Sequence, residues 1–383
     1  MTNILYIHQS SELYGSDKTL LYLVAEIKQN GFNPIVVLPS TGPLYTELQQ
    51  LGIEIIIAPV LKISRKMFSF SNMISMPFQT FRSFEIIKKQ LKGRHIHMVH
   101  SNTLAVLTGA LYAKRYHIRH LWHVHEIVAH PKLISDLYPK IVDYFSDIVV
   151  FNSSATQEFM IRKKPAMIEK STIILNGFDR TVSKSTSLEI HKFRTFFFNA
   201  TDNEVVLALV GRISRWKGQQ LLLNAFRLLE KEMPGVKLVF VGSAPPNQEI
   251  FLESLLEKIK EFDLDEKVTV VPFQNDIWKI WDSIDIAVVP STEPEPFGLV
   301  AIEAMLASKP VIGANHGGLC EIIVEGKTGF LVEPNNDILL KEALLKLVKD
   351  KSLRDRLGSE GRERATHFFS LKRYVDDFIK LYR

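Results

Sequence analysis

A short run of glycine and basic residues follows six consecutive apolar residues in the second half of the chain. The run reads Gly211-Arg-Ile-Ser-Arg-Trp-Lys-Gly218, and it separates the predicted strand Val205–Val210 from a helical pattern. The guanidinium of Arg212 offers phosphate oxygens coplanar donors, and the ammonium of Lys217 adds a point charge. Backbone N–H groups in the first turn of the following helix also attract anions. The pattern predicts a diphosphate site, with a plain basic turn as the alternative, and the residue order of a Walker A loop is absent.

Two glutamates, Glu295 in a loop and Glu303 in an apolar helical stretch, lie eight positions apart. Eight helical residues rise about 12 Å, which is too far for two carboxylates that share one reaction centre. Such a separation suits two groups that hold opposite ends of one extended ligand. Between them, the N–H groups of Phe297, Gly298 and Leu299 lie at a predicted helix start, which favours an anion. The pattern predicts a nucleoside diphosphate sugar as ligand, with a solvated loop acid and an exposed helix acid as the alternative.

Short apolar strands alternate with helical patterns over most of the chain. Because such strands form parallel sheets covered by helices on both faces, the alternation predicts an α/β protein. It restarts after an irregular stretch, so we expect two Rossmann-like β/α/β domains that face each other across a cleft. The predicted strands include Asn3–His8, Pro34–Leu38, Ile53–Ile57, His97–His100, Leu121–Val124, Ile148–Phe151, Thr172–Leu175, Val205–Val210, Val236–Val241, Val268–Val271, Ile286–Val289 and Pro310–Ile312. Ligands of such sheets bind beyond the carboxyl ends of the strands.

The restart of the alternation sets the predicted domain boundaries. Residues 1–180 form the first domain, residues 181–203 the linker, and residues 204–365 the second domain. The linker has no clean periodicity beyond an irregular helix near residues 191–198. The last helix, within residues 366–383, carries two apolar rows that must be buried. It can pack on its own domain or cross back to the first.

Composition excludes several classes of protein. The 383 residues are 46% hydrophobic and contain one cysteine, Cys320, which excludes an intrachain disulfide and a multi-cysteine zinc site. The start lacks a signal-peptide pattern and no 18-residue apolar run occurs, so we expect a cytoplasmic protein. Residues 1–200 carry 23 Lys and Arg against 14 Asp and Glu, or +9, whereas the remaining residues carry 24 against 28, or −4. The basic half suggests an anionic partner, with ordinary variation as the alternative.

Taken together, these motifs resemble glycosyltransferase family 4, also described as glycosyl transferases group 1. The matching segments are Gly211-Arg-x4-Lys-Gly218, Glu295-x7-Glu303, Asn176-Gly-Phe-Asp179, Val289-Pro-Ser291, Gly317-Gly-x-x-Glu321 and Gly326-x-x-Gly329. The similarity covers essentially the whole chain and is strongest over residues 205–335. It implies a GT-B fold and a retaining, metal-independent transfer from a nucleotide-diphosphate sugar.

The resemblance implies a role for each matched residue. Arg212 and Lys217 would neutralise the departing diphosphate, Glu295 would hold hydroxyls of the donor sugar, and Glu303 would bind the ribose hydroxyls. The residues assigned to the donor are Arg212, Lys217, Glu295, Phe297, Gly298, Leu299, Glu303 and Gly15; those assigned to catalysis are His125, Glu295, Lys217 and Arg212. We expect no metal and no cofactor, because cationic side chains and helix-terminal N–H groups supply the positive charge.

The first domain would bind the acceptor. Trp122-His-Val-His-Glu126 ends a predicted strand and resembles the family's histidine–acid element, which would place His125 near the transferred bond. His123 is the lesser candidate, and a structural histidine is the alternative for both. Ser101-Asn-Thr103 ends a neighbouring strand and could line the acceptor pocket; the alternative is a helix cap before Leu104.

Two segments depart from the family pattern. The family's glycine-rich loop corresponds to Leu13-Tyr-Gly-Ser-Asp17, where Tyr14 replaces one of two adjacent glycines. The segment Phe273-Gln-Asn275 lacks a glycine that often follows the aromatic residue near the nucleobase. Neither the base nor the contacts of Gly15 can therefore be transferred from the family.

Residues 62–94 combine basic and aromatic side chains. Eight of them are basic and one, Glu85, is acidic, with several phenylalanines and methionines between them. This composition suits a peripheral membrane surface, because apolar insertion adds to attraction by anionic lipid. A core helix with a solvated basic face is the alternative, and no motif for nucleic acid accompanies the charge.

We therefore expect a hexosyltransferase of class EC 2.4 that uses a UDP or GDP sugar. The expected acceptor is a glycan, in particular a lipid-linked intermediate of cell-surface polysaccharide, O-antigen or capsule biosynthesis at the cytoplasmic face of the membrane. Alternatives are a small-molecule glycosyltransferase such as a sugar-phosphate synthase, a catalytically silent scaffold in a glycan-assembly complex, and an epimerase of the same fold.

Overall fold

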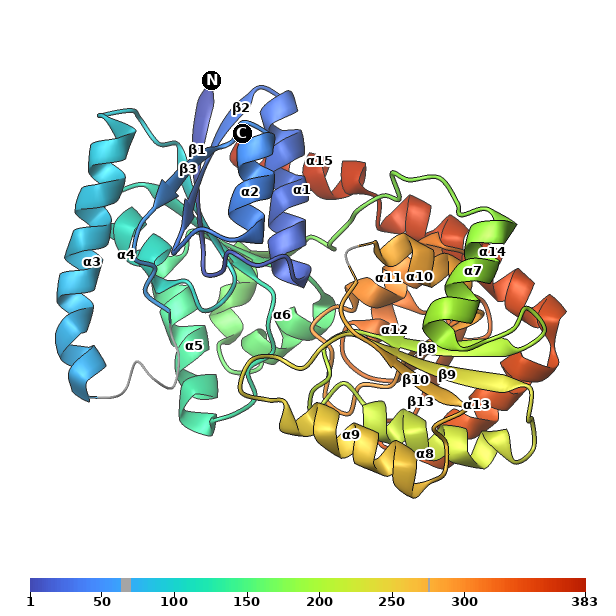
Figure 1. Cartoon of the computed structure of the whole chain (residues 1–383). Helices are drawn as coiled ribbons and strands as arrows, with labels where there is room; N and C mark the ends of the chain where they lie inside the picture. Colours follow the sequence, from blue (N-terminus) through green and yellow to red (C-terminus); the bar gives the residue numbers. More distant parts are fainter. Residues whose placement is uncertain (63–69, 275) are drawn as a thin grey trace. The chain divides into compact units, whose positions relative to one another are not determined.

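The computed structural model describes residues 1–62, 70–274 and 276–383, with the backbone alone for residues 70–74. Within these residues the chain divides into two compact units. Unit 1 combines Met1–Phe178 with Ser370–Arg383, and unit 2 is the continuous segment Asp179–Phe369. Each unit is built on one parallel sheet, which confirms the predicted pair of Rossmann-like folds (Figure 1).

The sheet of unit 1 has the strand order β3-β2-β1-β4-β5-β6-β7. Its strands are β1 (Thr2–His8), β2 (Phe32–Leu38), β3 (Glu54–Ile57), β4 (Met98–Asn102), β5 (Arg119–Val124), β6 (Ile148–Phe151) and β7 (Ser171–Ile173). Its helices are α1 (Gly15–Gln29), α2 (Pro43–Gln50), α3 (Phe70–Leu91), α4 (Leu107–Tyr116), α5 (Lys132–Phe145), α6 (Ser154–Ile161) and α15 (Leu371–Tyr382), with a 3₁₀ turn at Pro165–Lys170. Apolar side chains of α3, α4 and α5 pack on one face of the sheet, and those of α1, α2 and α15 pack on the other.

The last helix, α15, completes the core of unit 1. The Tyr6 hydroxyl donates to the Tyr382 hydroxyl at 3.0 Å, and the Tyr382 oxygen lies 2.7 Å from His100 Nδ1. Phe378 is fully buried and stacks on the His100 ring. Of the two placements that the apolar rows allowed, the structure therefore has the one in which the helix joins the first sheet.

The sheet of unit 2 has the order β10-β9-β8-β11-β12-β13. Its strands are β8 (Val205–Val210), β9 (Val236–Val241), β10 (Val268–Val271), β11 (Ile286–Val289), β12 (Val311–Ala314) and β13 (Gly329–Val332). Its helices are α7 (Ser187–Phe198), α8 (Gln219–Glu230), α9 (Ile250–Glu261), α10 (Ile277–Ser283), α11 (Leu299–Leu306), α12 (Leu319–Ile322), α13 (Asp337–Lys349) and α14 (Lys351–Phe368). Helices α8, α9 and α13 pack on one face, and α7, α10 and α11 lie over the other (Figure 1).

The segment predicted as a linker, residues 181–203, is an ordered part of unit 2. It contains the regular helix α7, whose Thr186 cap pairs reciprocally with Glu189. Arg194 of this segment contacts Asp285, and the Ser185 N–H donates to Asp282 at 2.7 Å. Arg180, just before the segment, bonds both carboxylate oxygens of the same Asp282. These partners lie about 90 to 100 positions away in sequence, so local periodicity could not reveal them.

In both sheets the strand order reverses at one point, where later strands are added on the other side of the first strand. In unit 1 the reversal lies between β1 and β4, and in unit 2 between β8 and β11. At such a point the connecting loops diverge, and the carboxyl ends of the two central strands line a crevice that is a favoured ligand site. His8 and Asn102 end the central strands of unit 1, and Gly211 and Pro290 follow those of unit 2.

Candidate functional site

The loops after β8 and β11 bring Lys217 and Glu295 into direct contact. Lys217 Nζ donates to Glu295 Oε1 at 2.6 Å, and the Ser291 hydroxyl donates to the same oxygen at 2.6 Å. The Glu295 side chain is 5% exposed and that of Lys217 16%. A carboxylate at this depth needs a counter-charge, so the pair fixes both side chains at the carboxyl edge of the sheet.

The main chains of these two loops touch at Gly218. Gly218 has φ +83°, and a Cβ at this position would lie 2.1 Å from the Pro290 carbonyl oxygen. The Thr292 N–H also donates to the Trp216 carbonyl at 2.8 Å. Glycine at 218 is therefore required both by the backbone conformation and by the close approach.

A third segment, at the end of β12, supports Glu295 from its backbone. The Gly318 N–H donates to the Glu295 carbonyl at 2.8 Å, and a Cβ on Gly317 would lie 2.3 Å from that oxygen. His316 Nε2 lies 2.8 Å from the Ser291 carbonyl, and burial lowers the pKa of this imidazole. The sequence indicated the glycine pair but gave no role to His316, whose place depends on the β11–β12 pairing.

Glu303 lies on α11 with 8% of its surface exposed. The Trp281 indole N–H donates to its Oε2 at 3.3 Å. Helix α11 begins at Leu299, after Gly298 with φ +117°. The predicted 12 Å rise between the two glutamates was therefore wrong, because residues 295–298 are not helical.

The other loop residues predicted around the donor in unit 2 differ in exposure and contacts. The Arg212 carbonyl accepts from the Gln219 side chain at 2.9 Å, which fixes the loop backbone before α8. Arg215 forms an exposed ion pair with Glu293. Phe297 is buried, whereas Phe273 is half exposed and Asn275 lies outside the described residues.

In unit 1 the predicted residues His125 and Asn102 are in contact. Three adjacent strands, β1, β4 and β5, end at His8, Asn102 and Val124, and the register pairs His8 with Asn102. His125 Nε2 lies 3.1 Å from Asn102 Oδ1. His125 is 8% exposed, and its burial lowers its pKa to about 3, with a smaller contribution from His8.

Glu126 is held beside His125 by two backbone donors. Its Oε2 accepts from the Leu104 N–H at 2.8 Å and from the His125 N–H at 3.1 Å. Burial nevertheless raises the pKa of Glu126 above the ordinary value. The acid therefore connects the ends of β4 and β5.

The helix-cap interpretation of residues 101–103 is wrong, because α4 begins only at Leu107 after Val106. Asn102 is 1% exposed and points into the histidine cluster. Thr103 has φ +91°, an outlier for a β-branched residue. Strain of this kind is concentrated at functional sites and costs about 1 to 3 kcal/mol.

Gly15 is the first residue of α1 and is exposed. The segment predicted as a loop up to Asp17 therefore includes the first helical turn. The Tyr14 N–H donates to Asp17 Oδ2 at 2.8 Å, so the acid caps the helix that Gly15 opens.

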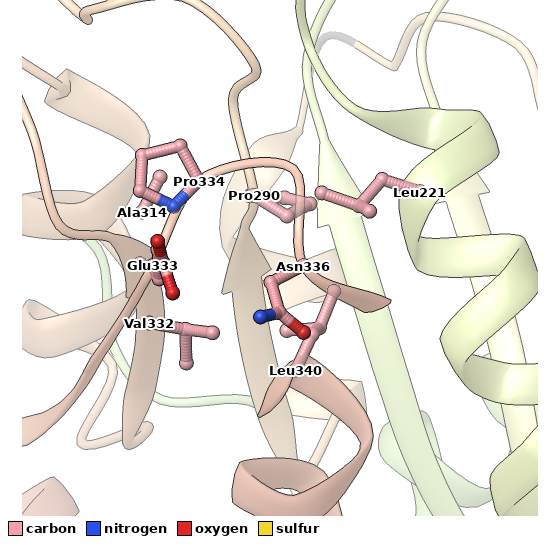
Figure 2. A pocket seen from close by; sticks show the side chains of 9 residues that line it. Leu221, Pro290, Ala314, Val332, Glu333, Pro334, Asn336 and Leu340 are labelled. Carbon is pink, nitrogen blue, oxygen red and sulfur yellow. The ribbon is translucent and has the colours of Figure 1, made fainter. Parts of the chain in front are cut away.

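Figure 2 shows a small pocket lined in part by Pro290, the residue that Gly218 approaches. It is lined mainly by apolar residues, including Leu221, Pro290, Val332 and Leu340, and its one charged residue is Glu333. A pocket without a cation does not suit phosphate, so it is a packing feature beside the site rather than the site itself. Among the described residues, no group of three or more acidic, histidine or cysteine side chains could hold a metal ion, and no helix is long and apolar enough to span a bilayer.

Comparisons with known proteins bear on this arrangement. The family model named glycosyltransferase family 4 matches residues 14–182, and the one named glycosyl transferases group 1 matches residues 192–364. The capsular polysaccharide biosynthesis glycosyltransferase CapM of Staphylococcus aureus is 26% identical over 64% of this chain and 64% of its own length. Trehalose synthase of Thermococcus litoralis is 25% identical over 68% of this chain and 63% of its own length. The chain thus spans less than two thirds of either relative.

A solved structure covers more of the chain. Anabaena HepE, in complex with UDP and glucose, has a TM-score of 0.86 at 24% identity, covering 100% of this chain and 99% of that one. The class that these findings define is the GT-B glycosyltransferases. Within it, the chain belongs to glycosyltransferase family 4, whose two family models together match residues 14–182 and 192–364.

We expect Gly218→Ala to lower the free energy of unfolding of unit 2 by at least about 1 kcal/mol, because the new Cβ meets the Pro290 carbonyl and the φ is unfavourable. Urea denaturation measures the change. Gly235→Ala is the control, since a Cβ there has no neighbour within 4 Å. Equal stability of the two variants would contradict the close approach of the loops.

Buried histidines predict acid lability of unit 1. Burial lowers the pKa of His120 to about 4 and of His125 to about 3, and it lowers those of His100 and His123 well below 6.5. A lowered folded-state pKa leaves stability intact above pH 6.5 and removes it as pH falls, because the unfolded chain binds the proton first. The raised pKa of Glu126 acts in the opposite direction, because the folded state binds this proton first, but it is one group against four histidines.

His123→Leu should reduce this pH dependence, because both ring nitrogens of His123 are buried and have no hydrogen-bond partner among the described residues. Below pH 6.5 the loss of stability should become shallower by up to about 1.4 kcal/mol per pH unit. Urea midpoints at pH 7, 6 and 5 measure the slope. The same substitution at exposed His95 controls for the change of residue, and an unaltered slope in His123→Leu would refute the assignment.

Proposed function

We propose that the chain transfers a hexose from a UDP or GDP sugar to a glycan acceptor, with retention of configuration. The observation that carries the proposal is the buried Lys217–Glu295 pair at the reversal point of the second sheet, with Glu303 on the adjoining helix. The UDP complex of the structural relative and the family motifs support a nucleotide sugar as donor. Retention rests on the family resemblance.

In this proposal unit 2 holds the donor. Lys217 has three N–H donors, so it can retain Glu295 while it binds a phosphate oxygen. Arg212 and the N–H groups at the starts of α8 and α11 add positive potential, which stabilises the charge that develops on the departing diphosphate. These groups take the place of a metal ion.

The two glutamates then bind hydroxyl groups of the donor. Glu295 accepts hydrogen bonds from hydroxyls of the sugar, and Glu303 accepts them from the ribose. Trp281 and Ser291 already orient one oxygen of each carboxylate. The sites therefore require no rearrangement of buried charge when the ligand arrives, which lowers the cost of binding.

Unit 1 supplies His125, which we place against the donor sugar, and the acceptor site. The exposed surface that α3 and α5 contribute supports a lipid-linked acceptor at an anionic membrane. On α3, Phe78 and Phe81 are 69% and 64% exposed beside Arg82, while Ile87 and Leu91 are buried in the core. The helix thus combines a core face with an exposed apolar and basic face; residues 63–69 lie outside the described residues.

Helix α5 extends this α3–α5 surface. Leu133 and Tyr144 are 77% and 68% exposed, and Lys132 and Lys140 of the same helix are also exposed. Both helices pack against α4, on the same face of the sheet. Exposed apolar side chains that insert into lipid and lysines that contact lipid phosphates both favour the α3–α5 surface as a membrane interface. The similarity to a capsular polysaccharide glycosyltransferase supports an acceptor of polysaccharide biosynthesis. A soluble acceptor is the second candidate, favoured by the trehalose synthase relatives.

We expect Glu303→Gln and Lys217→Met each to lower kcat/KM for sugar transfer by about 100-fold or more, because each removes a charge that faces the nucleotide. Glu303→Gln keeps an acceptor for the Trp281 N–H. Thermal shifts with UDP, GDP, dTDP, ADP and CMP identify the base, since a ligand at 100 times Kd stabilises by about 2.7 kcal/mol.

Glu293→Gln is the matched control, because Glu293 lies in the same loop but pairs with Arg215 at the surface. It should retain near-normal transfer. Near-normal kcat/KM in both site variants would refute the donor site. Full transfer activity of the wild type on a soluble acceptor, without lipid, would favour the second candidate.

For the membrane, we expect the chain to float with vesicles that contain anionic lipid and to lose this binding in a variant with Phe78→Ser, Phe81→Ser, Lys88→Gln and Lys89→Gln. Two lysines near such a surface contribute about 2 kcal/mol. Phe196→Ser is the control, since Phe196 is 81% exposed on α7 of unit 2. Equal flotation of the wild type and the quadruple variant would exclude the α3–α5 surface.

A further inference from the structure

A chain of hydrogen bonds leads from Asp17 to His125 in unit 1. Asp17 Oδ1 lies 2.5 Å from His8 Nε2. His8 Nδ1 lies 3.0 Å from Asn102 Nδ2, and Asn102 Oδ1 lies 3.1 Å from His125 Nε2. Asp17 is 2% exposed, Asn102 1%, and His8 is fully buried.

The donors and acceptors along this chain fix one another. Asn102 Nδ2 faces two acceptors, His8 Nδ1 and the Ser16 carbonyl at 3.3 Å, so the amide oxygen must face His125. An amide oxygen only accepts, and therefore His125 must carry its proton on Nε2. The same reasoning runs back along the chain, since a carboxylate at Asp17 requires a proton on His8 Nε2. His8 Nδ1 lies 3.3 Å from the Asn102 carbonyl oxygen and 3.0 Å from Asn102 Nδ2, and the shorter contact is the one in which the bare Nδ1 accepts from the amide.

We propose that Asp17, His8 and Asn102 are positioning residues that hold His125 in its Nε2–H tautomer, so that the Nδ1 lone pair accepts a hydrogen bond from a substrate hydroxyl. The proposal rests on the proposed function, which places His125 against the donor sugar. It adds which nitrogen acts, in which protonation state, and which three residues determine this.

The tautomer selects the chemical class of the partner. A bare imidazole nitrogen attracts a hydroxyl, whose hydrogen it accepts, and it repels a phosphate or carboxylate oxygen. Burial lowers the pKa of His125 and therefore also favours the neutral ring. His125 therefore acts as a hydrogen-bond acceptor for a sugar hydroxyl, and the diphosphate is left to the cationic residues of unit 2.

The geometry at the end of β4 supports a role beyond packing. Thr103 follows Asn102 with a positive φ, and within the part of the chain that the structure describes its buried Oγ1 has no hydrogen-bond partner. The Thr103 N–H donates to the His123 carbonyl at 2.9 Å, which holds the end of β4 against β5. The strained backbone thus presents the Asn102 amide to two histidines at once.

Nuclear magnetic resonance tests the tautomer directly in the full chain. Two-bond ¹H–¹⁵N correlations of ring-labelled histidine distinguish protonated from bare ring nitrogens, and the His125→Gln variant identifies the His125 signals. We expect Nε2–H and bare Nδ1 in the wild type. In Asn102→Leu the signal should become that of mixed tautomers, whereas Asn102→Asp, which retains an acceptor oxygen, should keep Nε2–H.

Kinetics with the nucleotide sugar provide the second readout. We expect Asn102→Leu to lower kcat about tenfold or more, with little change in KM for the donor and partial recovery in Asn102→Asp. Asn33→Leu is the matched control on the same sheet, because Asn33 lies near the amino end of β2 and bonds Asn3 rather than His125. It should change neither the His125 signals nor kcat.

The outcomes separate the two proposals. Absence of transfer in the wild type would refute the proposed function, while the tautomer measurement would still decide the positioning. A proton on His125 Nδ1, an unchanged tautomer in Asn102→Leu, or unchanged kcat in that variant despite altered signals would each overturn the positioning role.

Discussion

The need to neutralise one buried carboxylate governs the second unit. Glu295 lies at the carboxyl edge of the sheet with 4% of its surface exposed, where an unpaired charge would cost several kcal/mol. Lys217 supplies the charge, and the two loops can approach closely enough only because Gly218 lacks a side chain against Pro290. Gly317 lets a third loop close over the Glu295 backbone. The ion pair and the close packing thus depend on each other, which leaves the candidate donor site little freedom.

The first unit holds a buried carboxylate without a lysine. Asp17 contacts the imidazole of His8, and Asn102 connects His8 to His125. In the function proposed above, the fixed positive charge of unit 2 would bind the diphosphate, and the neutral imidazole of His125 would accept from a hydroxyl. The neutral state follows from burial, which lowers the pKa of His125 to about 3.

The strands and site residues that depend on a local sequence pattern could be predicted from the sequence. The strands Val205–Val210 and Val236–Val241 agree with the observed bounds, because apolar runs next to glycine, interrupted in the second strand only by Lys237, are a strong signal. Lys217, Glu295 and Glu303 were assigned from family motifs, and the structure brings Lys217 and Glu295 into contact. By contrast, β13 is four residues long and begins at Gly329, whose contact with the Val311 backbone gives no periodicity. Asn102 and His8 meet only through strand register across 94 positions, and no local pattern encodes that meeting.

The position of α15 affects how the chain is made. Unit 1 contains the first 178 residues but needs residues 370–383 to cover one face of its sheet. During synthesis the core of unit 1 therefore remains incomplete, and Tyr6 and His100 lack their contacts with α15, until this helix has left the ribosome. Unit 2, which is continuous in sequence, can complete its core earlier. Of the two units, the one that is translated first is thus completed last, and a ribosome that stops before residue 370 releases a chain whose first sheet lacks α15.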